Sequence, residues 1–382
     1  MNEKELYEQL EKIQHLNQEA MEAATAREES LAKPPKSLGW LEDVAIRLAG
    51  ITGNIHNYAD KSCIAVMSSD NGVVVEGVSS APQSVTLSQT INMTRRLTGV
   101  GTLAKYFNVD LLITDVGINA DLPKELLADH PLEQHNGELR VTNKIVNRKI
   151  RKETWNLAKG PAMTREEAVT AIGIGIEMAR SIKEGGYHIF GIGEMGIGNT
   201  TTSSAILSAL TGLPVSETVG KGGGITDASY NHKKKIIEEA LKRNDFAGQP
   251  DIDVIDVLAK VGGFDIAAMA GAYLGAAIYR LPVVIDGFIS IIAALVAFKL
   301  APLSSKYMIA SHISKEIGYN HALNSLGLVP MLNLDLRLGE GSGCPLAFQI
   351  IRGACTIIND MATFEEAKIN DDYLEEIRKL DF

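Results

Sequence analysis

Cysteine and aromatic residues are scarce in this sequence of 382 residues, and their scarcity argues against several kinds of protein. The three cysteines, Cys63, Cys344 and Cys355, form no Cys-x-x-Cys pair, and the eight histidines form no His-Glu-x-x-His motif. The sequence therefore lacks the signature of a disulfide framework and of the common zinc sites. Because sparse unpaired thiols are typical of a reducing compartment, we expect a cytoplasmic protein, and we expect no metal or other cofactor.

Positive charge and long apolar runs are also in short supply. Lys and Arg number 37 against 47 Asp and Glu, which gives a net charge of -10. Proteins that bind nucleic acid usually carry excess positive charge, because phosphates dominate that affinity. The densest cationic run, residues 233–235, is typical of a solvent-exposed helix face. The longest uncharged runs of the most apolar region, 266–279 and 287–298, are shorter than the ~20 residues of a membrane-spanning helix. We expect neither nucleic acid nor membrane as a partner.

Short apolar runs alternate with amphipathic stretches along the chain. The runs with the character of buried strands are residues 63–67, 110–116, 187–191 and 281–285. The stretches that predict helices between them are residues 84–98, 164–182 and 264–279. This alternation is typical of an α/β fold of the Rossmann-like kind, in which helices cover both faces of a mostly parallel sheet.

Amphipathic segments near the ends of the sequence predict a second, smaller helical domain. Residues 4–24 and 38–50 have apolar residues at helical spacing, and Pro34 and Pro35 separate them. The expected division is an N-terminal part of the small domain over residues 1–55, a nucleotide- and base-binding α/β domain over 56–343, and C-terminal helices over 344–382 that pack with the small domain. Residues 117–160 are polar and predict no clear element.

Polar loops follow the expected strands or precede expected helices at four places. They are residues 68–83, 191–200, 286–290 and 339–343. Ligands of open parallel sheets bind beyond the carboxyl ends of the strands, so we expect these loops to build one site.

The first glycine loop has two interpretations that involve a ligand. Gly191, Gly193 and Gly196 form a Gly-x-Gly-x-x-Gly pattern after a strand, which is typical of dinucleotide binding. Glu194 lies inside this pattern, where its charge would repel a pyrophosphate. We therefore favour binding of a single phosphate or ribose, and a tight turn without a ligand is the alternative.

Two further glycine segments can contact a ligand. Three consecutive glycines at 222–224 stand before an expected helix, where backbone N–H groups can form an anion-binding nest with Lys221 or Lys233 as charge partner. A surface turn is the alternative. Glu340 stands between two glycines, and partial burial would raise its pKa from about 4.3 into the range of a general base. An exposed acid on a loop is the alternative.

Six segments together resemble one enzyme family. Within residues 33–358 they are, in order, KPPKSLGWLE, SSDNGVVVEGVSSAPQSVT, GEMGIGNTT, VGGFDIAAMAGAYLGAA, LPVVIDGFI and LRLGEGSG. The set resembles the nicotinate-nucleotide–dimethylbenzimidazole phosphoribosyltransferases of cobamide biosynthesis. Members of that family displace nicotinate from C1′ of nicotinate mononucleotide with an aromatic base and form the α-ribotide that becomes the lower ligand. The resemblance therefore implies a glycosyltransferase that acts in cobalamin biosynthesis.

The resemblance also implies which residues form the site. Glu340 matches the general base that removes a proton from the attacking base. The residues expected to contact the nucleotide are Glu194, Gly196, Gly198, Asn199, Thr200, Gly222, Gly223, Gly224, Lys233 and Asp286. The residues expected to contact the aromatic base are Asp70, Asn71, Ala81, Gln89 and Leu338.

The sequence departs from the family in the base region. The family usually has Asp-His-Gly where this chain has Asp70-Asn71-Gly72, and one branch has a hydroxyl residue at the position of Ala81. The base is therefore open among benzimidazoles, purines and phenols. We expect a homodimer, and a heterodimer with a paralogue is the alternative. Two other functions stay open: an NAD(P)-dependent oxidoreductase that uses Gly191–Gly196, and a non-catalytic paralogue that supports a catalytic partner.

Overall fold

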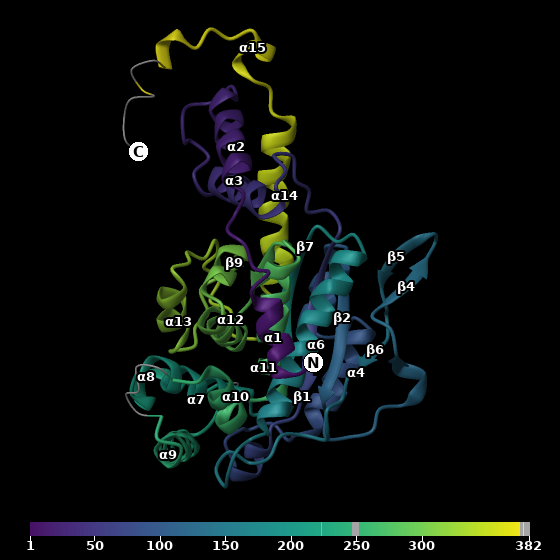
Figure 1. The fold of residues 1–382 in the computed structure, drawn as a ribbon, viewed down its shortest axis with the longest axis vertical. Coiled ribbons are helices and arrows are strands. Elements are labelled where there is room, and N and C mark those ends of the chain that lie inside the picture. The colour runs from purple at the N-terminus through teal and green to yellow at the C-terminus, as the bar shows by residue number, and fades with distance from the viewer. Residues whose placement is uncertain (223, 247–251, 375–376, 378–382) are drawn as a thin grey trace.

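The computed structural model describes residues 1–222, 224–246, 252–374 and 377, and a seven-stranded parallel sheet forms its centre (Figure 1). The order across the sheet is β3-β6-β2-β1-β7-β8-β9. The strands are β1 (Ser62–Ser69), β2 (Asp110–Gly117), β3 (Leu127–Ala128), β6 (Ile145–Asn147), β7 (Ile189–Met195), β8 (Val283–Ile285) and β9 (Met308–Ala310). The antiparallel pair β4 (Leu132–His135) and β5 (Glu138–Val141) projects from the body as a hairpin.

The strands are buried on both faces, as the continuous apolar runs predict. In β1, Cys63, Ala65 and Met67 join one hydrophobic core, whereas Ile64 and Val66 join another on the opposite face. The first face is covered by α6 (Arg165–Glu184), α10 (Val254–Val261), α11 (Phe264–Ile278) and α12 (Phe288–Leu300). The second is covered by α4 (Ser84–Thr94), α5 (Gly99–Tyr106) and α14 (Cys344–Asp360). The predicted Rossmann-like α/β fold is therefore confirmed.

Further helices lie beside this three-layered body. They are α7 (Asn199–Thr211), α8 (Val215–Thr218), α9 (Asp227–Arg243) and α13 (Tyr319–Leu326). Short 3₁₀ helices are η1 (Gly72–Glu76), η2 (Lys124–Leu126), η3 (Pro302–Tyr307) and η4 (Asp372–Leu374). In the described part of the chain, no helix combines the length and the apolar character needed to cross a membrane.

A small helical domain projects from one end of the body (Figure 1). It consists of α2 (Gln18–Ser30), α3 (Trp40–Thr52), the end of α14 and α15 (Phe364–Ala367). Its own core is a cluster of four buried alanines on α2 and α3 with Ile358 of α14.

The expected boundaries of this domain need two corrections. Residues 4–24 form two helices, because Asn17 caps α2 by accepting a hydrogen bond from the backbone N–H of Ala20 at 3.0 Å. The first of them, α1 (Glu3–Leu10), packs on α6 and α11, so its apolar residues belong to the core of the body. Likewise, Phe348 and Ile351 in the first half of α14 cover the sheet. The small domain therefore contains less than residues 1–55 and 344–382.

Candidate active site

A cavity of about 240 Å³ opens beyond the carboxyl ends of β7, β8 and β9. Its walls come from parts of residues 78–89, 194–200, 286–290, 312–316 and 337–340, and from Lys221, Gly222 and Ile225. The four loops predicted from the sequence thus meet at one cavity, as expected. In the sheet, β2 lies on one side of β1 and β7 lies on the other, so the strand order reverses at β1. Open α/β sheets bind ligands at such a switch point.

Glu340 lies in this cavity on a tight left-handed turn. Three consecutive residues, Gly339, Glu340 and Gly341, have φ angles of 85°, 62° and 90°. Glycine adopts such angles freely, but a residue with a Cβ does so at a cost, and strained residues of this kind gather at functional sites. The flanking glycines therefore allow the turn, and the turn directs the carboxylate of Glu340 to the cavity.

The side chain of Glu340 meets the first turn of α5. Its Oε2 accepts a hydrogen bond from the backbone N–H of Val100 at 3.0 Å, near the positive end of that helix. The residue is 6% exposed, and burial raises the pKa of its carboxyl, while hydrogen bonds from Val100, Thr98 and Gly99 lower it. The net result is a raised pKa, which suits a group that must both lose and accept a proton.

Two other buried carboxylates hold the backbone of this turn. Oε1 of Glu194 accepts the N–H of Glu340 at 3.1 Å. The two oxygens of Asp286 accept the N–H groups of Gly341 at 2.9 Å and Gly343 at 2.7 Å. Both acids line the cavity, as predicted for the nucleotide site, but these oxygens are already engaged by the protein. Their contacts indicate a positioning role for the turn that carries Glu340.

Asn199 connects Glu194 to a further buried acid. Its Nδ2 donates to Oε2 of Glu194 at 2.5 Å and to Oδ2 of Asp265 at 3.2 Å. Burial raises the pKa of Glu194, of Asp265 and of Asp286 to about 7 in each case. Buried acids with pKa values near neutral pH therefore lie at the cavity: Glu194 and Asp286 line it, whereas Asp265 does not.

One end of the cavity has the features of a phosphate site. Gly196, Gly198 and Thr200 line it at the N-terminus of α7, where backbone N–H groups and the helix dipole favour an anion. Gly222 lines the same end with φ 55°, and its position leaves a Cβ only 3.1 Å from Oγ1 of Thr200. Gly224 is exposed and does not line the cavity, and Gly223 lies outside the described residues.

Lys233 stands behind this end. Only 1% of its surface is exposed, and its Nζ donates to Oγ1 of Thr200 at 2.8 Å. Burial lowers the pKa of Lys233 to about 8, and the nearby Glu316 opposes that shift. Lys233 is not on the cavity wall, so it reaches a ligand only through Thr200 or after a small movement.

Several wall residues were missed by the sequence reasoning. His312, Ser314 and Glu316 follow β9, a three-residue strand that the sequence did not reveal. Arg337 was overlooked although it lies inside the quoted segment LRLGEGSG. Burial lowers the pKa of His312 to about 4, so its imidazole is neutral at pH 7. In the described ranges, no three His, Cys, Asp or Glu side chains are grouped so as to hold a metal ion.

A further part of the cavity wall combines apolar side chains with Ser79, Ser80 and Gln89. Ala81, Gln89 and Leu338 line it together with Val78 and Val85, so three of the five residues predicted for the base are at the cavity. An apolar slot with a few polar groups suits a flat aromatic ring.

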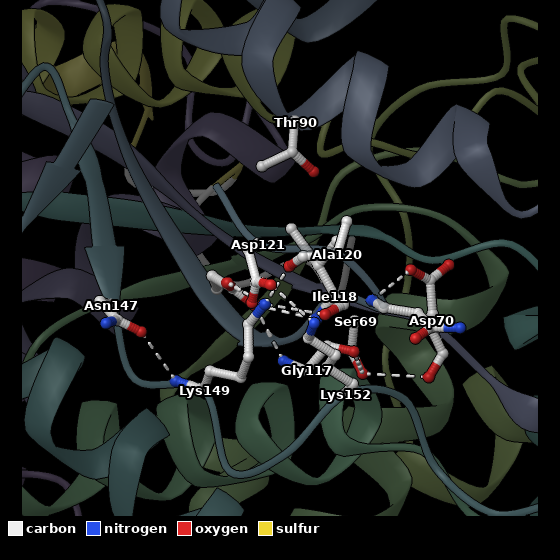
Figure 2. Close-up of polar contacts among 12 residues, drawn as sticks. Ser69, Asp70, Thr90, Gly117, Ile118, Ala120, Asp121, Asn147, Lys149 and Lys152 are labelled. Carbon is white, nitrogen blue, oxygen red and sulfur yellow. Dashed lines mark hydrogen bonds and ion pairs between the residues drawn. The ribbon is translucent and has the colours of Figure 1, made fainter. Parts of the chain in front are cut away.

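Asp70 and Asn71 do not lie on the cavity wall. Burial raises the pKa of Asp70 to about 6, and its Oδ2 accepts the backbone N–H of Asn119 at 2.9 Å (Figure 2). Asn71 is fully buried against Gly263, where an added Cβ would lie 2.5 Å from Oδ1 of the asparagine. The structure therefore corrects their expected place: both lie beneath the site, because η1 starts immediately after them and turns the chain away.

The Gly-x-Gly-x-x-Gly pattern is not a loop. Gly191 and Gly193 are inside β7, which continues to Met195. A Cβ on Gly191 would lie 2.5 Å from Cβ of Cys344, and one on Gly193 would lie 2.2 Å from the carbonyl oxygen of Glu340. These glycines let the strand touch the turn that carries Glu340, and the geometry does not support the dinucleotide alternative.

Comparisons with known proteins agree with this geometry. A family model described as phosphoribosyltransferase, DBI_PRT, matches residues 13–369. The nicotinate-nucleotide–dimethylbenzimidazole phosphoribosyltransferase of Clostridium perfringens is 53% identical over 373 residues, which are 98% of each chain. The enzyme of the same name from Ruminiclostridium cellulolyticum is 48% identical over 363 residues, or 95% of this chain and 97% of that one.

Solved structures give the same result. The crystal structure of CobT from Thermus thermophilus has a TM-score of 0.83 at 39% identity and covers 92% of this chain and 99% of its own. A second structure, named as the phosphoribosyltransferase of the same organism, has a TM-score of 0.82 at 38% identity, and covers 93% of this chain and 99% of its own. The resemblance seen in the six segments is confirmed, and the chain belongs to the DBI_PRT family of phosphoribosyltransferases.

Proposed function

We propose that the protein transfers the 5-phosphoribosyl group of nicotinate mononucleotide to an aromatic base and forms an α-ribotide for the lower ligand of a cobamide. The observation that carries the proposal is Glu340. A buried carboxylate is fixed by a left-handed turn in a cavity whose wall includes both the N-terminus of α7 and the apolar side chains of residues 78–85. The names of the relatives supply the substrates, and 5,6-dimethylbenzimidazole is the first base to test.

The nucleotide is proposed to enter with its phosphate at the N-terminus of α7. Gly196, Gly198, Thr200 and Gly222 surround this position, and Lys233 is the nearest buried cation. Lys221 is engaged by Asp227 at 2.6 Å, so it is not the main charge partner. This arrangement favours a single phosphate over a pyrophosphate, because the carboxylate of Glu194 lies directly next to the glycines.

The proposed reaction is a displacement at C1′ of ribose. The bond from C1′ to the quaternary ring nitrogen of nicotinate breaks, and its electron pair returns to that nitrogen, so the leaving group needs no proton. Positive charge develops at C1′, as in glycoside transfer. A nitrogen lone pair of the base attacks from the opposite face, which inverts the β-nucleotide to an α-ribotide. The ring N–H proton of the base passes to the carboxylate of Glu340.

The protein is proposed to accelerate the reaction in two ways whose typical effects on rate are known. Fixing two reactants in line can supply several kcal/mol of the barrier reduction. A positioned base supplies ~10²–10⁴-fold in rate. The contacts of Glu194 and Asp286 with the turn at 339–343 are proposed to serve the second contribution, because they fix the direction of Glu340.

The partners and location of the protein stay predictions. We keep the homodimer as the expected assembly, with the heterodimer as its alternative, and we keep a cytoplasmic location. The preferred base also stays open. Ala81 and the neighbouring valines provide no charge that would select a phenolate over a neutral ring.

A direct product experiment tests the proposal. The purified protein is incubated with nicotinate mononucleotide and with 5,6-dimethylbenzimidazole, adenine or a phenol, and products are identified by mass and by NMR at C1′. We expect release of nicotinate and an α-configured ribotide with at least one base. Absence of product with every base, together with tight binding of NADH, would instead support the oxidoreductase.

A further inference from the structure

Lys149 is surrounded by oxygen atoms of one loop, about residues 117–121 (Figure 2). Its ammonium donates to the carbonyl oxygen of Ile118 at 2.8 Å and to that of Ala120, and it lies 3.2 Å from Oδ2 of Asp115. The ammonium thus has three acceptors, which is the number of hydrogens it carries. Carbonyl oxygens that converge on one cation in this way would repel one another without it.

Asp115 completes the same arrangement from the end of β2. Its Oδ1 accepts the backbone N–H groups of Gly117 at 3.1 Å and Ile118 at 2.9 Å. The residue is 1% exposed, and burying a charged carboxylate without a positive partner would destabilise the folded protein. Lys149 and Asp115 together therefore fix the backbone of the loop from both its carbonyl and its N–H groups.

The loop presents Asn119 to the segment that leads to the base end of the cavity. Nδ2 of Asn119 donates to Oε1 of Gln83 at 3.0 Å, and its backbone N–H donates to Oδ2 of Asp70 at 2.9 Å. Nε2 of Gln83 donates to Oε2 of Glu153 at 2.5 Å. Gln83 is therefore held from two sides, although it does not itself line the cavity.

Gln83 is the nearest polar anchor of the base wall. Within the described residues, 78–82 form hydrogen bonds only with each other and with the first turn of α4. Gln83 directly follows them and is the N-cap residue of α4, which carries Val85 and Gln89 into the cavity. A shift of Gln83 would therefore move both the segment 78–82 and the start of α4, which together form this wall.

We propose that Lys149 is a positioning residue for the aromatic base, and that it acts through Asn119 and Gln83 on the wall at 78–89. The inference rests on the proposed function, since it assigns that wall to the base. It concerns the base first, because the loop donates hydrogen bonds to Gln83 and Asp70. The phosphate end joins this wall one step further on, where the backbone N–H of Ile197 donates to Oγ1 of Thr86 at 3.1 Å.

The test compares two lysines of the same segment. Lys149→Ala removes the ammonium from the loop, whereas Lys152→Ala removes only an exposed ion pair with Asp121 at 2.7 Å. We expect Lys149→Ala to raise KM for 5,6-dimethylbenzimidazole about tenfold, the size of one lost charged hydrogen bond, with KM for nicotinate mononucleotide changed less than about twofold. Lys152→Ala should change neither constant by more than about twofold.

Chemical rescue separates this role from general damage to the fold. Propylammonium fits the space left by the lysine side chain, and it should lower KM for the base in Lys149→Ala, whereas propanol or tetramethylammonium should not. Equal rises of KM for both substrates, or no rescue by the amine, would overturn the inference. Turnover by the wild type with the same substrates tests the proposed function separately, so the two failures are distinguishable.

A second variant keeps the test decisive if Lys149→Ala does not fold. Asn119→Ala leaves the ammonium and its acceptors in place and removes only the link to Gln83. KM for the base should rise about threefold with KM for the nucleotide unchanged. Adding Asn119→Ala to Gln83→Ala should have no further effect, because the side chain of Asn119 then has no Gln83 side chain to contact. Additive effects of the two changes, or no effect of Asn119→Ala, would overturn the inference.

Discussion

At the residue scale, Lys233 is the most unusual charge in the molecule. An ammonium with 1% exposure has a hydroxyl, Oγ1 of Thr200, as its hydrogen-bond partner at 2.8 Å, and no carboxylate within ion-pair distance in the described chain. Burial favours the neutral amine and lowers the pKa to about 8. A phosphate at the N-terminus of α7 would supply the missing negative charge, so the lysine is prepared for an anionic ligand.

We therefore predict that affinity for nicotinate mononucleotide depends on pH through Lys233. The protonated lysine attracts the phosphate, so affinity should be constant from pH 7 to about 8 and should fall by up to about tenfold per pH unit above that. Lys233→Met should bind at least about tenfold more weakly at pH 7 and should lose this dependence. Isothermal titration calorimetry from pH 7 to 9.5 measures both effects.

Lys235→Met is the matched control, because Lys235 is exposed on the same helix and pairs only with Glu239. It should bind like the wild type. A wild-type affinity that is the same at pH 7 and pH 9.5 would contradict the role of Lys233.

The run at 233–235 also shows which properties of a single residue the sequence does not predict. The helix is confirmed, and the prediction of a solvent-exposed face is right for Lys235 but wrong for Lys233, which is buried. The burial of Lys233 depends on Thr200 and Glu316, which are distant in the sequence. Glu340 could be predicted because its flanking glycines are adjacent in the chain. Arg337 and Glu316 could not, because loops that meet only in the folded molecule bring them to the cavity.

At the scale of elements, β7 is the part of the site that the sequence describes least well. A glycine-rich stretch indicates a loop, and residues 187–191 were expected to be the whole strand. In the structure β7 includes Gly193 and Glu194 and ends at Met195. The glycines are explained by the turn at 339–343 packing on the strand, a contact between segments about 150 residues apart that leaves no local signal. The short strands β3, β6 and β9 were missed for a related reason, since two or three residues carry no periodicity.

The glycine segment before α9 leads to a prediction on binding. Gly222 has φ 55°, and a Cβ there would press on Thr200 at 3.1 Å. Gly222→Ala should weaken binding of nicotinate mononucleotide about tenfold and leave KM for the base within about twofold, because only the phosphate end is disturbed. Steady-state kinetics with each substrate varied in turn measure the two constants.

Gly212→Ala is the control, because it introduces the same kind of backbone strain at a position away from the cavity. Gly212 is the C-cap of α7 with φ 72° and has open space around it. The change should cost about 1 kcal/mol of stability and leave both constants unaltered. If Gly222→Ala weakens both substrates equally, the assignment of this segment to the phosphate is wrong.

At the scale of the whole molecule, the buried acids set the pH dependence of stability. Burial raises the pKa of Asp70 to about 6, and of Glu194, Asp265 and Asp286 to about 7. In the unfolded chain these groups titrate near pH ~4, so the folded state holds more protons between about pH 4 and pH 7. By linkage, stability falls as pH rises through this window and levels off above it.

We predict that the free energy of unfolding is lower at pH 8 than at pH 5 by at least about 1 kcal/mol. Urea denaturation at the two pH values measures it. Glu194→Gln should make the decline smaller, because one of the groups no longer titrates, and Glu239→Gln on the exposed face of α9 should not. A free energy that rises from pH 5 to pH 8 would contradict the burial of these charges.

The small helical domain gives a prediction on assembly. In the described chain its own hydrophobic cluster contains five buried residues, and the domain projects from the body (Figure 1). The segment 4–24, which first suggested a partner, is partly covered within the chain because α1 packs on α6 and α11. The domain itself still has little core of its own, and twofold dimers are the commonest closed assemblies.

Light scattering at micromolar concentration should therefore give about twice the chain mass of 41.2 kDa. A mass of one chain would contradict the dimer, and a doubled mass that appears only after a paralogue is added would favour the heterodimer. The fold class and the family could be predicted from the sequence at this scale, because alternating apolar runs and six ordered segments are spread over the whole chain. The boundary of the small domain could not, because it depends on which apolar surface each terminal helix finds.

The central claim is that Glu340 is the general base of a phosphoribosyl transfer, and one series of turnover measurements tests it. Glu340→Gln keeps the shape of the side chain and can still accept the N–H of Val100, but it cannot take a proton. With nicotinate mononucleotide and 5,6-dimethylbenzimidazole, turnover should fall ~10²-fold or more while nucleotide affinity is unchanged. With a nucleophile that is already ionised at the assay pH, the loss should be much smaller. Turnover that survives with the ordinary base, or an equal loss with both nucleophiles, would contradict the account.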